Sequence, residues 1–142
     1  MIGLDTNVLV RYIAQDDSGQ AAAATALIES LSADAPGFVT LVSAVELVWV
    51  LKACYGANRD SIAEVLETLL RTKELIVERN DVVWQALRRY RDTQADFADC
   101  LIERCAHAAG CEYVVTFDRM AVRDAGMRLI GQGHPPLQSS PP

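Results

Sequence analysis

The chain begins Met1-Ile2-Gly3-Leu4-Asp5-Thr6-Asn7-Val8-Leu9-Val10, and this stretch decides the fold. The apolar residues before Asp5 form a short run of the kind that makes a buried strand. From Thr6 onward the apolar residues recur with helical spacing, so we expect a helix over residues 6–14, capped by Asp5 or Thr6. A strand that passes directly into a helix is typical of the start of an α/β fold.

The rest of the chain repeats this alternation of short apolar runs and longer helical patterns. The predicted strands are residues 2–5, 38–40, 75–77, 113–117 and 127–130, and the predicted helices are residues 6–14, 18–31, 43–55, 58–72, 80–93, 96–110 and 118–125. Strands that alternate with helices imply a small parallel sheet covered by helices on both faces. In such α/β folds the working crevice lies at the carboxyl ends of the strands.

The composition suits one globular domain, because 142 residues, 51% of them hydrophobic, are enough to bury a core. We expect residues 1–131 to form that domain and the proline-rich residues 132–142 to be a disordered tail. No apolar run is long enough to span a membrane, and the N-terminus lacks the pattern of a signal peptide. The expected compartment is therefore the cytoplasm.

Acidic residues stand where strands or helices would deliver them to one pocket. Asp5 and Asp118 each end an apolar run, and Glu46 lies in a strongly apolar helical stretch. Asp96 and Asp99 are three residues apart, so they share one face of a helix. Carboxylates that converge in apolar surroundings are costly unless a cation neutralises them, and a divalent metal is the simplest remedy. The pattern therefore indicates a metal-dependent enzyme.

Each acid also has a purely structural interpretation. Asp5, Asp96 and Asp118 all stand at predicted helix starts, where an aspartate is a common cap. Glu46 could pair with Lys52 or an arginine. Asp99 lies further inside its helix and is a better candidate ligand than Asp96, whose role as ligand or cap stays open.

The net charge and the cysteines bear on two other possibilities, nucleic-acid binding and a zinc site. A net charge of −6 taken alone argues against a nucleic-acid partner, because phosphates attract basic surfaces. Part of that charge belongs to the proposed metal pocket, where bound cations would offset it. The four cysteines form no C-x-x-C pair and no trustworthy zinc pattern, even with His107 nearby, so they are expected to be free thiols: Cys54, Cys100, Cys105 and Cys111.

Four segments resemble the PIN domain, and within that family the VapC-type toxin ribonucleases. They are IGLDTNVLV at the start, VSAVELVWVL around Glu46, DFADCLIERCA from Asp96 and YVVTFDR up to Arg119. The resemblance implies a small parallel sheet between helices, and Mg²⁺ or Mn²⁺ held by Asp5, Glu46, Asp99 and Asp118, with Asp96 as an additional acid. It further implies an endoribonuclease that hydrolyses RNA phosphodiester bonds as the toxin of a toxin–antitoxin pair.

The resemblance also assigns supporting roles. Thr6 and Asn7 match positions near the metal, and Thr116 matches a supporting polar position. Ser43 is a further candidate for such a supporting role. Arg119 is a candidate for binding the scissile phosphate, with a surface role as the equal alternative. The family comparison suggests a homodimer and a small antitoxin, one of whose arginines would complement the carboxylates.

Two other functions compete with the nuclease. One is a phosphotransfer module of the receiver or haloacid-dehalogenase type, although the dehalogenase signature needs a second Asp where Asn7 stands. The other is a non-catalytic module that binds RNA or a partner with the same fold. Labelling by acetyl phosphate would favour the first, and metal binding without RNA cleavage would favour the second.

Overall fold

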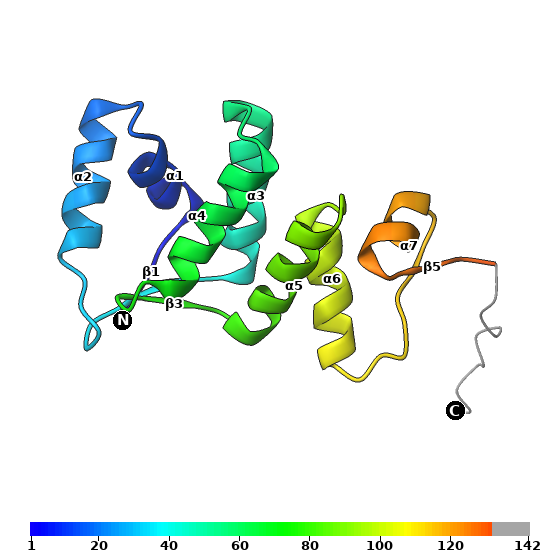
Figure 1. The fold of residues 1–142 in the computed structure, drawn as a ribbon. Helices are drawn as coiled ribbons and strands as arrows, with labels where there is room; N and C mark the ends of the chain where they lie inside the picture. The colour runs from blue at the N-terminus through cyan, green and yellow to red at the C-terminus, as the bar shows by residue number, and fades with distance from the viewer. Residues whose placement is uncertain (132–142) are drawn as a thin grey trace, which may run out of the picture.

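The computed structural model describes residues 1–131, which form short strands alternating with helices (Figure 1). In chain order the elements are β1 (Ile2–Gly3), α1 (Thr6–Ala14), α2 (Ser18–Glu29), β2 (Gly37–Val39), α3 (Leu41–Tyr55), α4 (Arg59–Arg71), β3 (Leu75–Val77), α5 (Asn80–Asp92), α6 (Phe97–Ala108), β4 (Val115–Thr116), α7 (Arg119–Ala125) and β5 (Arg128–Leu129). The α/β class is confirmed. The predicted tail, residues 132–142, lies outside the described residues.

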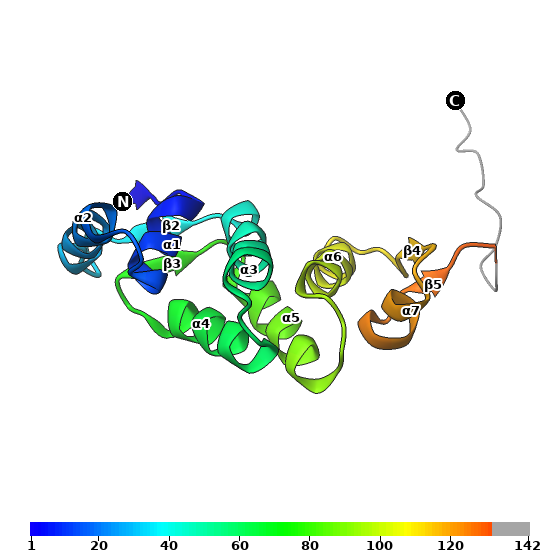
Figure 2. The same ribbon diagram turned by 90° about the horizontal axis from the view of Figure 1, so that it is seen from above.

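The parallel strands form two sheets, where the sequence pattern suggested one. β1, β2 and β3 pair in that order, and β4 pairs with β5. Helices α3 and α6 lie between the two sheets in both views (Figures 1 and 2). The alternation of strands and helices fixes the strand direction but carries no information about which strands pair, because parallel pairing joins residues far apart in the sequence.

The helix boundaries follow from their end residues. Thr40 accepts a hydrogen bond from the backbone N–H of Ser43, so α3 begins two residues earlier than predicted. Asn58 caps α4 in the same way through the N–H of Ser61. Gly56 and Gly126 end α3 and α7 in the left-handed conformation, with φ of 62° and 78°, which glycine adopts without strain.

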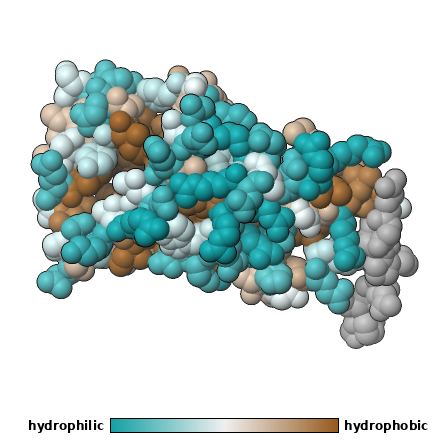
Figure 3. Space-filling view, viewed as in Figure 1, coloured by the Kyte–Doolittle hydropathy of each residue, from teal (hydrophilic) through white to brown (hydrophobic). Residues whose placement is uncertain are grey.

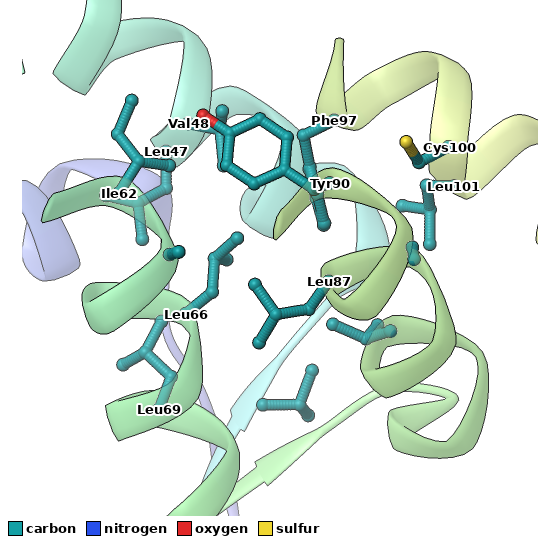
Figure 4. Close-up of a cluster of buried hydrophobic side chains, with 14 of the residues drawn as sticks. Leu47, Val48, Ile62, Leu66, Leu69, Leu87, Tyr90, Phe97, Cys100 and Leu101 are labelled. Atoms are coloured by element: carbon teal, nitrogen blue, oxygen red, sulfur yellow. The ribbon is translucent and has the colours of Figure 1, made fainter. Parts of the chain in front are cut away.

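The hydrophobic core lies among α3, α4, α5 and the start of α6. Leu47, Leu66, Leu87 and Phe97 are all at most 2% exposed, and Figure 4 shows them pointing toward one another from these helices. The rings of Tyr90 and Phe97 meet edge to face at 6.0 Å, which joins the end of α5 to the start of α6. This core therefore fixes where the first turn of α6, with its two aspartates, is placed.

The surface is mainly hydrophilic on the face seen in Figure 3, with apolar side chains gathered over α1, α2 and α4. A hollow of about 370 Å³ lies between these helices, lined by Tyr12, Ile13, Ile28, Val65 and Leu69 among others. It contains none of the predicted site residues. The hollow is a gap in the packing of α1, α2 and α4.

Candidate active site

Asp5 ends the segment after β1 and stands at the N-cap of α1. Its backbone C=O accepts from the N–H of Val8 at 3.0 Å, but its side chain makes no capping hydrogen bond and is exposed. The side chain is therefore free of the structural role that the sequence allowed. The next residue, Thr6, is only 4% exposed, and its hydroxyl is the buried side-chain oxygen that lacks a hydrogen-bond partner among residues 1–131. Such an unpaired buried hydroxyl is costly.

Glu46 lies on the outer side of α3. The inner side of this helix is buried through Ala44, Leu47 and Val48, whereas Val42 and Trp49 are 67% and 64% exposed. Glu46 thus lies in the strongly apolar helix that the sequence indicates, and its own side chain is exposed. The strongly apolar sequence of α3 concealed which side faces the core, because most positions around the helix looked equally suited to burial.

A groove runs between α3 and α6, and we call it the α3–α6 groove. One end is a hollow of about 370 Å³ lined by Leu41, Val42, Val45, Glu46, Ala98, Leu101, Ile102 and Cys105. The adjoining hollow, of about 360 Å³, is lined by Val45, Val48, Trp49, Lys52, Ala53, Asp96 and Ala98. The two hollows share Val45 and Ala98, so the groove has an apolar floor with Glu46 and Asp96 on its walls.

Asp96 and Asp99 stand at the start of α6. Asp96 occupies the N-cap position but makes no side-chain capping bond, and it is exposed. Asp99 is partly buried, and its pKa is raised by burial, then by the negative charges of Asp96 and Asp118. Burial also raises the pKa of the neighbouring Cys100 thiol to about 11, so this thiol stays protonated and unreactive at neutral pH.

Asp118 caps α7. Its carboxylate accepts from the backbone N–H groups of Met120 at 2.9 Å and Ala121 at 3.4 Å. The hydroxyl of Thr116 accepts from the N–H of Asp118 at 3.0 Å, which fixes the turn between β4 and α7. Arg119, the first residue of α7, is exposed beside this turn. The capping role and an outward-facing carboxylate oxygen coexist at Asp118.

The structure brings only some of the acids together. Asp96, Asp99 and Asp118 lie close enough for their charges to interact, whereas Asp5 and Glu46 take no part in the interactions that shift the pKa of Asp99. Within residues 1–131 no three Asp, Glu, His or Cys side chains are close enough to hold a metal ion. The donors nevertheless fit Mg²⁺ or Mn²⁺ in kind, since all are carboxylates, and a bound cation would offset both causes of the raised pKa of Asp99, its burial and the nearby charges of Asp96 and Asp118.

The remaining residues that the sequence analysis discussed differ in how far they are buried. Ser43 is 7% exposed in the first turn of α3, below Glu46, and Asn7 is exposed in the first turn of α1. His107 is in the last turn of α6 and is exposed, far along that helix from the aspartates. All four cysteines are free thiols.

Arg59 has a structural role that its position in the sequence did not reveal. Its Nη2 donates to three backbone carbonyls, of Tyr90 at 2.6 Å, Thr93 at 3.0 Å and Ala95 at 2.9 Å. Its guanidinium also lies 3.8 Å from the centre of the Tyr90 ring. Arg59 thus holds the loop that leads into Asp96. The available signal was weak: an arginine at the first position of a helix opposes the helix dipole and so needs another reason to be there.

No helix within residues 1–131 has the length and hydrophobicity needed to cross a membrane. Comparison with known proteins gives a family match and a similar protein. The family profile described as "PIN domain" matches residues 2–126. A "VapC ribonuclease" of Aquifex aeolicus (strain VF5) is 32% identical over 117 residues, which is 82% of this chain and 86% of that protein.

Proposed function

The chain belongs to the PIN-domain family, and from this premise we propose that it is a Mg²⁺- or Mn²⁺-dependent endoribonuclease that acts as the toxin of a toxin–antitoxin pair. The name of the relative, VapC ribonuclease, supports RNA as the substrate. The observation that carries the proposal is the placement of Asp99, partly buried at the start of α6, where burial and then the charges of Asp96 and Asp118 raise its pKa. Uncompensated carboxylates of this kind are typical of sites built for a cation.

The proposed metal ligands are Asp5, Glu46, Asp99 and Asp118, with Asp96 as an additional acid. When bound, the cation would stabilise the charge that develops on the phosphodiester and favour an attacking hydroxide. Thr116 holds the backbone of Asp118 and so orients its carboxylate. Thr6, Asn7 and Ser43 are proposed as polar supports around Asp5 and Glu46.

Arg119 is proposed to bind the RNA phosphate. It is exposed and directly follows Asp118, so its guanidinium can reach a phosphate that approaches the acids. Bidentate hydrogen bonding makes arginine well suited to this contact. The same acids would accept an arginine from a small antitoxin partner, which would block RNA and metal together, and we propose that the toxin is a homodimer.

The test is cleavage of a mixed RNA pool, transfer RNA included, with Mg²⁺ or Mn²⁺. We expect EDTA to abolish cleavage, and Asp99→Asn to lower the rate by roughly 100-fold or more, since losing even a residue that only orients a metal ligand costs about 10- to 100-fold. Asp34→Asn is the matched control, because Asp34 is exposed in the loop between α2 and β2, away from the acids. Equal cleavage by both variants would refute the site.

The separation of Asp5 from the other acids favours a second candidate, a non-catalytic module that binds RNA or a protein. The two candidates differ in one result. If the folded, antitoxin-free protein binds Mn²⁺ and RNA but cleaves no RNA in the pool, the binding module is the better description. Loss of Mn²⁺ binding in Asp99→Asn would then locate the cation without reference to turnover.

A further inference from the structure

Three arginines meet in a hollow between α5 and α6, two helices that lie side by side in both views (Figures 1 and 2). We call it the arginine hollow. It measures about 370 Å³ and is lined by Gln85, Arg88, Arg89, Asp92 and Arg104. It shares no lining residue with the α3–α6 groove and contains none of the proposed metal ligands. Its size is within the range of small-ligand sites, and its lining side chains suit a polar ligand.

Two of these arginines have no acidic partner. Within residues 1–131, neither Arg88 nor Arg89 belongs to an ion pair. Arg88 is exposed, whereas Arg89 is partly buried beside the end of α7. A Cβ on Gly126 would lie 2.7 Å from the Nη1 of Arg89, so the missing side chain leaves room for this guanidinium. Like charges that line one hollow repel each other, and a bound anion would relieve that repulsion.

The third arginine is already held in place. Arg104 donates to the carboxylate of Glu103 through Nε at 2.6 Å and Nη2 at 2.7 Å, and these side chains are only 22% and 13% exposed. This pairing lowers the pKa of Glu103, and the charge of Arg89 lowers it further. A guanidinium has five N–H donors, so Arg104 can hold Glu103 and still donate to a ligand. Because its side chain is ordered beforehand, it loses less conformational entropy on binding.

The charge of the arginine hollow suits one phosphodiester. The three arginines outnumber the acids in and beside the hollow, Asp92 and Glu103, by one charge, although the whole chain carries a net charge of −6. A phosphodiester in a nucleic acid carries one negative charge. Guanidinium groups also match its geometry, since they can donate two parallel hydrogen bonds to phosphate oxygens.

The other two lining residues favour RNA over an acidic peptide. The carboxylate of Asp92 would repel the carboxylates of such a peptide, but it can accept a hydrogen bond from a ribose 2′-hydroxyl. The amide of Gln85 can donate or accept beside it. The hollow is also connected to the candidate active site through α6, because Arg104 follows Asp99 by five residues, about 7.5 Å along the helix axis.

We propose that the arginine hollow binds a backbone phosphate of single-stranded RNA through Arg88, Arg89 and Arg104. Asp92 accepts a hydrogen bond from the adjoining ribose. The bound phosphate is separate from the scissile one, so the hollow positions the RNA strand and takes no part in the chemistry. Only the identity of this RNA as the substrate rests on the proposed function; RNA binding itself does not.

The first test measures RNA binding in EDTA, where the metal-dependent cleavage is absent. Fluorescence anisotropy follows a labelled single-stranded RNA of mixed sequence over a range of salt concentrations. Each phosphate contact contributes about 0.7 to the slope of log K against log salt for a single strand. We therefore expect Arg88→Gln to reduce the magnitude of this slope by about 0.7 and to weaken binding by about 10-fold at low salt.

Two further variants control for this result. Arg88→Lys keeps the positive charge and should keep most of the slope. Lys73→Gln is the matched control, because Lys73 is exposed between α4 and β3, outside the hollow, and should leave the slope unchanged. Equal slopes in wild type and Arg88→Gln, or equal reductions in Arg88→Gln and Lys73→Gln, overturn the proposal. Wild type that binds no RNA overturns it, and so does displacement of RNA by poly-glutamate as effective as that by unlabelled RNA.

The second test looks for a gain of binding, which a misfolded variant would not give. Glu103→Gln removes the negative charge beside the hollow and releases the donors of Arg104, so RNA should bind several-fold more tightly. Glu29→Gln is the matched control, because Glu29 is exposed at the end of α2. Unchanged or weaker binding by Glu103→Gln, or an equal gain in both variants, overturns the proposal.

Cleavage assays then separate this proposal from the proposed function. With Mg²⁺ or Mn²⁺ present, Arg88→Gln should raise KM by about as much as it weakens RNA binding. An unchanged KM in this variant overturns the role of the hollow in holding the substrate. RNA binding with the expected salt slopes, but no cleavage by wild type, refutes the proposed function and supports the arginine hollow as an RNA site.

Discussion

The two sheets of this molecule are built from similar sequence patterns but are buried to very different extents. In the region of β1–β3 one side is buried, with Leu4, Val39 and Val77 only 4%, 0% and 5% exposed, while Ile2 and Ile76 on the other side are 45% and 41% exposed. In the unit formed by β4, α7 and β5, Val115 and Phe117 are 44% and 82% exposed. Local sequence specifies the strands equally well in both. The first sheet packs against α4, whereas the second is supported by α7, which also contacts α6.

The β4–α7–β5 unit therefore depends on helix packing. Its buried residues are mostly small, Ala121 and Ala125 together with Met127. A two-stranded sheet is at best marginally stable in isolation, so this unit should be the first part of the fold to open. The predictions below compare it with the β1–β3 region, beginning with the largest expected effect.

Leu66→Ala in the central core should lower the free energy of unfolding by about 2–5 kcal/mol, the usual cost of a large-to-small change at a buried site. Leu66 is 2% exposed among α3, α4 and α5. Met127→Ala, at 5% exposure, should cost less, because the exposed strands around it can relax into the space. Urea titration measures both, and hydrogen exchange should show the Met127→Ala effect confined to residues 113–131. A larger global loss for Met127→Ala would show that the unit is no weaker than the core.

Arg59→Met should lower the free energy of unfolding by about 2–4 kcal/mol, since it removes hydrogen bonds to three carbonyls and the contact with the Tyr90 ring. Arg59→Lys keeps the positive charge but not the planar guanidinium, so it should recover only part of the lost free energy of unfolding. Arg71→Met is the control, because Arg71 is an exposed helix arginine that donates to no backbone carbonyl in the described residues; it has an ion pair to Glu67 and lies 5.0 Å from the Trp84 ring. Thermal or urea unfolding measures all three. Equal losses for Arg59→Met and Arg71→Met would contradict the role of Arg59 in joining α4 to the α5–α6 loop.

Gly126→Ala should destabilise more than Gly56→Ala. Both glycines end a helix with positive φ, so each substitution costs about 1 kcal/mol in backbone strain. A Cβ on Gly126 would also lie 2.7 Å from the guanidinium of Arg89, whereas a Cβ on Gly56 meets nothing within 4 Å. Because this guanidinium is the far end of a flexible side chain and can swing aside, we expect only a small further loss at Gly126. Equal losses in urea titration would mean that Arg89 moves aside without cost.

Asp118→Asn should lower the pKa of Asp99, because one of the two negative charges that raise it is removed. The asparagine oxygen can still cap α7, so the fold is retained. A raised pKa in the folded state means that Asp99 opposes folding when ionised and that this penalty disappears as the pH falls through the folded pKa. Carbon-detected NMR titration of the Asp99 carboxyl measures the shift. Asp34→Asn is the control, and no difference between the two variants would place Asp118 outside the acid cluster.

Much of the fold was predictable because its signals are local. Residues 6–14 were predicted and found as a helix, and the helices predicted to end at residues 55 and 125 do end there, each followed by a glycine with positive φ. The division of the strands into two sheets was not predictable. It depends on how α3 and α6 pack against other elements, which no periodicity within a segment records.

The candidate site, like the fold, was predictable only in part. The positions of Asp5 and Asp118 just beyond strand ends, and of Asp99 inside a helix, were read from the sequence and found in the structure. Their common metal site remains a proposal. Arg59 could not be found from sequence, since its partners are backbone carbonyls more than thirty residues away and carbonyls carry no residue signature.

The two tryptophans of the chain lie in contrasting surroundings. Trp49 is 64% exposed on the wall of the α3–α6 groove, whereas Trp84 is partly buried, with the Arg71 guanidinium 5.0 Å from its ring. Anything that occupies the groove removes water from one indole and leaves the other unchanged. The molecule thus contains an optical probe and its own internal reference, and a blue shift of the Trp49 emission would follow groove occupancy in real time without any attached dye.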